Sequence, residues 1–216
     1  MPPEAVERWL LEALAFYRRL DFFSSPKTDE EVAEWLLRTA GRRYRRQDIG
    51  SPLVDDDWFF HRDLGLLSCD RRRTLSLDFE SPGMGGHTMY EYELPRLARI
   101  TRGVFEPAGI HELALDTERD GAVLLTFIAN GEPREYILGG GNSDWLDWKL
   151  LWIVDEHLQD SEVRLHAAAD PAPGQNIFLA ALTAAERDAI EHRRRLEFVP
   201  LPAQPVSAWN WWWATV

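Results

Sequence analysis

The sequence predicts an α+β protein, in which an N-terminal helical pair precedes a central antiparallel sheet and packed C-terminal helices. Two observations lead to this fold class. Apolar residues recur every three or four positions in the first third of the chain, and every second position from about residue 57 to 138. Helices and strands that are segregated along a chain are typical of α+β proteins. With 45% hydrophobic and 28% charged residues, the composition is that of a globular protein, and we expect a single domain, 1–216.

An N-terminal helical subregion is expected over residues 1–47. One apolar stripe predicts a first helix from about Pro3 to Leu20. The stripe comprises Val6, Trp9, Leu10, Ala13, Phe16, Tyr17 and Leu20. After the break at Ser24-Ser25-Pro26, Thr28 is followed three residues later by Glu31. This spacing is the signature of a capping box, so a second helix is expected to begin here.

Strands are expected where apolar and polar residues alternate. Leu75, Leu77 and Phe79 show this alternation, and another strand is expected at residues 90–94. Three later runs predict an antiparallel meander over residues 112–115, 123–128 and 134–138. The dipeptides Asp120-Gly121 and Asn130-Gly131 favour the tight turns of such a meander.

The C-terminal part combines helices with short strands. An apolar stretch from Trp145 to Leu158 predicts a helix that is covered on two sides. Two strands are expected at residues 163–167 and 177–182. Thr183 and Glu186 form a second capping-box signature, which predicts a last helix to about Leu196. Residues 200–216 form a tryptophan-rich tail.

Charge and composition narrow the functional classes. The formal net charge of -12 argues against a nucleic-acid partner, because such surfaces need clustered Lys and Arg; a basic protein partner would be attracted instead. No segment has the uninterrupted apolar length of a membrane span, and the N-terminus lacks the basic start of a secretory signal. Cys69 is the only cysteine, which excludes an intramolecular disulfide. We therefore expect a soluble, cytoplasmic protein with no membrane partner.

No catalytic, metal or cofactor site is predicted. None of the six histidines forms the i, i+4 pair of a helical metal site. Ser68 and Cys69 do not lie in a nucleophile elbow. The glycines at 139–141 lack the lysine of a phosphate-binding loop, and Asp144 would repel an anion, so a strand-to-helix turn is favoured.

Two unusual segments are the best candidates for partner binding. The acidic run at residues 55–57 directly precedes an aromatic run. Three interpretations stay open: a solvated loop, a metal-binding loop, or an anionic patch beside an aromatic anchor. The C-terminal tryptophans can pack on the chain itself, contact a partner or insert at a membrane interface. The predicted partner-binding residues are Asp55, Asp56, Asp57, Trp58, Trp209, Trp211, Trp212 and Trp213.

The segment from about Tyr92 to Leu196 carries an ordered series of motifs. In chain order they are Leu97-Ala98-Arg99-Ile100-Thr101-x-Gly103-x-Phe105, Phe127-Ile128-Ala129-Asn130-Gly131 at a turn, Asp144-Trp145-Leu146-Asp147 opening an apolar helix, and Leu182-Thr183-Ala184-Ala185-Glu186 after a strand. This order resembles small immunity proteins encoded beside bacterial polymorphic and contact-dependent toxins. Asp155 and Glu156 stand where that family often has an Asn.

The resemblance implies a stoichiometric inhibitor that occludes the active site of a cognate protein toxin, needs no cofactor and is not an enzyme. It identifies neither the chemistry of the toxin nor the residues that contact it. Two other classes stay open. One is a metal-assisted hydrolase that uses Asp55, Asp57 and His61. The other is a chaperone or adaptor for a secreted effector.

Overall fold

The computed structural model describes residues 3–24, 26–45, 62–80, 89–115, 121–139, 145–169 and 176–201. It confirms the predicted α+β class, with N-terminal helices and antiparallel sheets. The chain divides into two compact units, Met1–Arg71 and Arg72–Val216. The expectation of a single domain stays a prediction.

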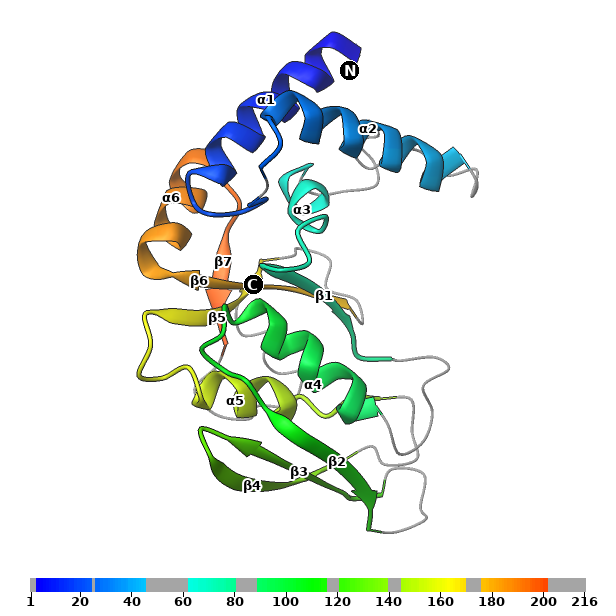
Figure 1. Cartoon of the computed structure of the whole chain (residues 1–216), viewed down its shortest axis with the longest axis vertical. Helices are drawn as coiled ribbons and strands as arrows, with labels where there is room; N and C mark the ends of the chain where they lie inside the picture. Colours follow the sequence, from blue (N-terminus) through cyan, green and yellow to red (C-terminus); the bar gives the residue numbers. More distant parts are fainter. Residues whose placement is uncertain are drawn as a thin grey trace. The chain divides into compact units, whose positions relative to one another are not determined.

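The first unit is helical (Figure 1). Its elements are α1 (Pro3–Arg18), α2 (Asp29–Arg45) and α3 (Arg62–Leu67). Both hydrogen bonds of the capping box expected at the start of α2 are present. Thr28 N donates to Glu31 Oε2 over 2.8 Å, and Glu31 N donates to Thr28 Oγ1 over 3.3 Å. The buried hydroxyl of Tyr17 donates to Asp63 over 2.8 Å, which joins α1 to α3. The unit Met1–Arg71 also contains α3, which follows residue 47, and the expected helical subregion 1–47 stays a prediction.

The second unit contains two antiparallel sheets (Figure 1). One has the strand order β1-β6-β5-β7 and is formed by β1 (Thr74–Asp78), β5 (Val163–Ala168), β6 (Asn176–Thr183) and β7 (Phe198–Pro200). The other has the order β2-β3-β4 and is formed by β2 (Ala108–Ala114), β3 (Val123–Ala129) and β4 (Glu132–Leu138). The helices of this unit are α4 (Met89–Ile100), α5 (Lys149–Glu156) and α6 (Ala184–Arg194).

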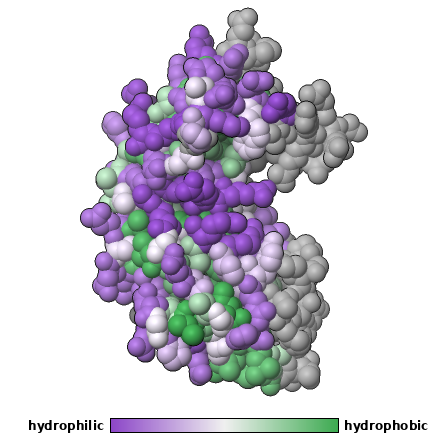
Figure 2. Space-filling view, in the orientation of Figure 1, coloured by the Kyte–Doolittle hydropathy of each residue, from purple (hydrophilic) through white to green (hydrophobic). Residues whose placement is uncertain are grey.

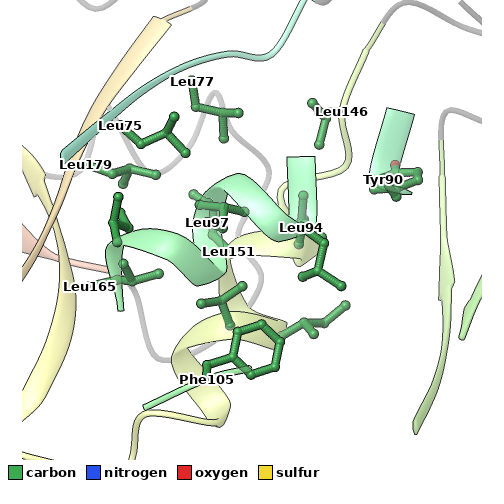
Figure 3. Close-up of a cluster of buried hydrophobic side chains, with 14 of the residues drawn as sticks. Leu75, Leu77, Tyr90, Leu94, Leu97, Phe105, Leu146, Leu151, Leu165 and Leu179 are labelled. Atoms are coloured by element: carbon green, nitrogen blue, oxygen red, sulfur yellow. The ribbon is translucent and has the colours of Figure 1, made fainter. Parts of the chain in front are cut away.

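A single buried cluster joins the two sheets through α4 and α5. Leu97 of α4 and Leu151 of α5 lie among the leucines of the four-stranded sheet, with Phe105 beneath them (Figure 3). Each sheet therefore turns one apolar face toward the same pair of helices. The ends of α6 follow from local chemistry: Thr183 and Glu186 form the predicted capping box, and Arg195 ends the helix in the left-handed conformation at φ 56°.

Two expectations about the strands need correction, and the helix expected from Trp145 begins at Lys149 instead. Residues 90–94, expected as a strand, belong to α4, where Tyr90, Leu94 and Leu97 recur at helical spacing and are all buried. The strands expected to form one central sheet are split, because β1 pairs with β6 while the meander forms its own sheet. The meander itself is confirmed, as are the strands expected near residues 163 and 177.

Candidate protein-binding surface

The outer face of the β2-β3-β4 sheet carries large apolar side chains that are open to solvent. Leu113 is 61% exposed and Ile137 is 60% exposed, and Leu115 and Ile128 are 48% exposed each. In the space-filling view, strongly hydrophobic atoms gather over this sheet (Figure 2). Because exposed apolar side chains in a cluster are unusual on a soluble domain, this surface is the candidate site.

The strand register places one apolar residue of each strand in a continuous row across the outer face of the sheet. Leu113 of β2 lies opposite Leu124 of β3, and Leu124 lies opposite Ile137 of β4. Directly opposed side chains in neighbouring antiparallel strands have Cβ atoms about 5 Å apart and contact one another. We call Leu113, Leu124 and Ile137 the apolar row.

A polar row lies two residues further along the same face. His111, Thr126 and Glu135 are opposed in register across the three strands. Beyond it, Ile128 lies opposite Pro133. The outer face thus alternates between an apolar row, a polar row and a second apolar pair, which is a pattern that a partner can distinguish.

The register of the hairpin is set by its turn. Asn130 and Gly131 both have positive φ angles, 54° and 79°. Two such residues make the primed two-residue turn whose twist matches that of antiparallel strands. The register fixes which side chains of β3 point outward, because a one-residue slip would exchange the two faces of the sheet.

Aromatic side chains support the sheet from its inner face. Phe127 stacks on Tyr136 at 5.7 Å and meets Phe105 edge-to-face at 5.8 Å, and His157 stacks on Phe105 at 4.8 Å. Burial lowers the pKa of His157, and Arg134 lowers it further, while Glu156 opposes the change. A neutral imidazole therefore fits this aromatic cluster at neutral pH.

Hydrogen bonds attach the sheet to α4 and to the start of α5. Tyr90 Oη donates to the carbonyl of Gly139 over 2.5 Å and accepts from Asp147 N over 2.9 Å. Burial raises the pKa of Tyr90, so its hydroxyl keeps the proton that it donates. Glu112 Oε2 accepts from Tyr90 N over 2.8 Å at the first turn of α4. These contacts make the sheet a fixed platform.

A second exposed surface lies on α4, next to β1. Arg96 Nη1 donates to Glu93 Oε1 over 2.5 Å, Nη2 reaches the carbonyl of Ser76 at 3.5 Å, and the guanidinium lies 5.2 Å from the ring of Tyr92. Burial raises the pKa of Glu93, whereas Arg96 lowers it and Asp78 raises it. Arg96 thus stabilises the buried carboxylate of Glu93 and covers part of the edge of β1. This structural role explains why Tyr92, Glu93 and Arg96 lie together, so we do not take them as a binding site.

The sequence-predicted contact residues lie outside the described part of the chain. This holds for Asp55, Asp56, Asp57, Trp58, Trp209, Trp211, Trp212 and Trp213, and also for His61. Their part in binding stays a prediction. The candidate surface was missed because its residues look like ordinary strand residues. The signal that was present is the pair Ile128 and Ile137, apolar residues at exposed strand positions: Ile128 lies between two buried residues, and Ile137 lies between the partly buried Tyr136 and the buried Leu138.

The side chains of Ser68 and Cys69 both donate a hydrogen bond to the carbonyl of Gly65, over 2.8 Å from Ser68 Oγ and 3.6 Å from Cys69 Sγ. Within residues that the structure describes, no group of three or more His, Cys, Asp or Glu side chains could hold a metal ion.

Comparisons with protein-family models, curated proteins and solved structures found no match to this chain. In the described residues, no helix combines the length and the apolar character needed to cross a membrane.

Proposed function

We propose that this chain is an immunity protein, which binds a cognate protein toxin through the outer face of the β2-β3-β4 sheet and occludes the toxin's active site. The observation that carries the proposal is the in-register apolar row, in which Leu113 and Ile137 are exposed and Leu124 between them is partly buried. Covering such a row removes apolar area from water, which is the main favourable term in protein association. The resemblance of residues 92–196 to immunity proteins supplies the class of the partner.

The charge of the chain supports a basic toxin. A formal net charge of -12 creates a field that attracts a basic protein and raises its association rate. The proposal includes a cytoplasmic site of action and no chemistry by this chain. Asp55, Asp56 and Asp57 are proposed as further acidic contacts, and the tryptophans of the tail as apolar ones.

The test uses the protein encoded by the gene adjacent to the one for this chain, purified as the toxin. Leu113→Asp and Ile137→Asp place a charge on the proposed surface at positions that are mostly solvent-exposed. Each should weaken the Kd by at least about thirtyfold, as expected for the centre of an interface, and should abolish the protection of growth.

Trp35→Asp is the matched control. Trp35 is also a large exposed hydrophobic residue, at 42%, but it lies on α2 in the first unit. Its replacement should leave the Kd unchanged. If both sheet variants fold and bind the toxin with the affinity of the unaltered chain, the proposed surface is wrong.

The toxin's activity separates this function from the two alternatives. An immunity protein abolishes the toxin's activity at equimolar concentration, whereas a chaperone or adaptor binds it and leaves it active. A metal-dependent hydrolase that uses Asp55, Asp57 and His61 would carry a stoichiometric metal ion, which elemental analysis of the purified chain detects.

A further inference from the structure

The three-stranded sheet has two edge strands, β2 and β4, and the chain itself occupies the first. The backbone N–H of Glu112 points away from β3, toward the free side of β2, and donates to Glu91 Oε1 over 2.9 Å. In return, Glu112 Oε2 accepts from the backbone of α4 at Tyr90, over 2.8 Å. The first turn of α4 therefore blocks the edge of β2 at this point.

The register shows which backbone groups of β4 point away from β3. The two-residue turn makes Ala129 and Glu132 a hydrogen-bonded pair, so every second residue from Glu132 faces β3. The residues between them, Pro133, Glu135 and Ile137, direct their backbone groups to the free edge. The backbone groups of Gly139 also point away from β3, and its N–H donates to Asp147 Oδ2 over 2.9 Å.

Among the described residues, a short interval of this edge carries backbone N–H groups with no hydrogen-bond partner. Pro133 has no N–H to offer, which is why a proline is tolerated here without loss of a ladder bond. The N–H of Gly139 is occupied by Asp147. Between them, Glu135 and Ile137 are exposed, and their N–H groups form no hydrogen bond with any residue that the structure describes. Such open groups are a template for a further strand.

The side chains at the open interval indicate the sequence of that strand. In a strand added antiparallel to β4, the residue opposite Ile137 would extend the apolar row, and the residue opposite Glu135 would extend the polar row. Glu135 forms no ion pair with a described residue, so a Lys or Arg opposite it gains an attraction that no intramolecular partner supplies. A second copy of this chain would instead bring the same glutamate and a net charge of -12 to the contact.

We propose that the open edge of β4 receives a strand of the toxin, with an apolar side chain opposite Ile137 and a Lys or Arg opposite Glu135. This inference rests on the proposed function for the source of the strand. It adds the mode of recognition: backbone hydrogen bonds at Glu135 and Ile137, and specificity from an apolar and a basic residue two positions apart.

The test measures amide hydrogen exchange of the full chain by NMR, with capped synthetic peptides as probes. One peptide has the sequence Thr-Ile-Thr-Lys-Thr, and its matched control has Glu in place of Lys. At millimolar concentration the Lys peptide should slow exchange of the Glu135 and Ile137 amides at least about tenfold, while the Glu peptide leaves both unchanged. Glu135→Lys should reverse this preference, and it keeps every ladder bond because residue 135 faces away from β3.

Each result supports or overturns the proposal that the edge of β4 binds an added strand. Protection at Glu135 and Ile137 that follows the charge swap supports it. Unchanged exchange with the Lys peptide, equal protection by both peptides, or protection that arises from dimerisation of the chain without peptide overturns it. If the toxin is neutralised but leaves these two amides unprotected, the edge is wrong and the proposed function stands. If the peptide protects them and no toxin is neutralised, the function is wrong and the edge stands.

Discussion

The two sheets of the second unit have similar strands but differ in what covers them. In β6, the neighbours Leu179, Ala180, Ala181 and Leu182 are all fully buried, so both faces of the strand are covered. In β3, buried residues alternate with residues that are partly buried or exposed. Both strands are apolar runs, and among the described residues only β6 has both of its faces covered. The apolar face that the described chain leaves open is the observation on which the proposed function rests.

Shortening one apolar residue in each sheet should give the largest contrast in stability. Leu179→Ala removes a fully buried side chain and should lower the free energy of unfolding by about 3 kcal/mol, through lost burial and a residual cavity. Ile137→Ala changes a side chain that is 60% exposed and should cost no more than about 0.5 kcal/mol. Urea denaturation measures both. Equal losses would mean that the outer face of the three-stranded sheet is covered within the chain.

The ion pairs that attach α6 to the rest of its unit should give the next largest effect. Glu186 accepts from Arg73 and from Arg102, each over 3.0 Å, and the Arg73 side chain is only 5% exposed. Glu186→Gln retains a capping side chain but removes the charge, so the loss should be about 2 kcal/mol. Asp188→Asn is the control, because Asp188 is an exposed partner of Arg187 on the same helix. Its cost should stay below about 0.5 kcal/mol; a similar cost for both would refute a special role for Glu186.

A smaller loss is expected from the turn of the open sheet. Gly131 has a φ of 79°, and a Cβ added there would meet no atom within 4 Å. Gly131→Ala should therefore cost about 1 kcal/mol through backbone strain alone. Thermal unfolding measures the loss, and the affinity for the toxin should fall only in proportion to it. A variant as stable as the unaltered chain would show that the hairpin tolerates another turn type.

The smallest effect concerns His166, a buried side chain of the covered sheet. Burial lowers the pKa of His166; its hydrogen bond with the carbonyl of Arg164 opposes this, Arg187 lowers the pKa, and Asp155 and Glu191 raise it. The unfolded chain then binds more protons than the folded one, so stability should fall as the pH drops below about 6.5. His166→Gln should reduce this dependence in urea titrations between about pH 7 and 5. An unchanged slope would assign it to other groups.

The features that the sequence predicted correctly depend on residues close together in the chain. The capping boxes at Thr28 and Thr183 and the turn at Asn130-Gly131 each involve positions within three residues of one another. Local hydrogen bonding and φ preferences decide such features, so they can be recognised without knowledge of the fold. The periodicity also gave the α+β class and most strands of the second unit.

Other features follow only from contacts between distant segments. The pairing of β1 with β6, the burial of Arg73 against Glu186, and the helical state of residues 90–94 depend on partners far along the chain. The open face of β2-β3-β4 is of the same kind. β3 and β6 have almost the same apolar character, and periodicity describes each strand without stating what lies above it. Only the tertiary structure decided that β6 is buried on both faces, and that the described residues leave an apolar row and a strand edge of the three-stranded sheet uncovered, because that depends on where the helices between and beside the sheets come to lie.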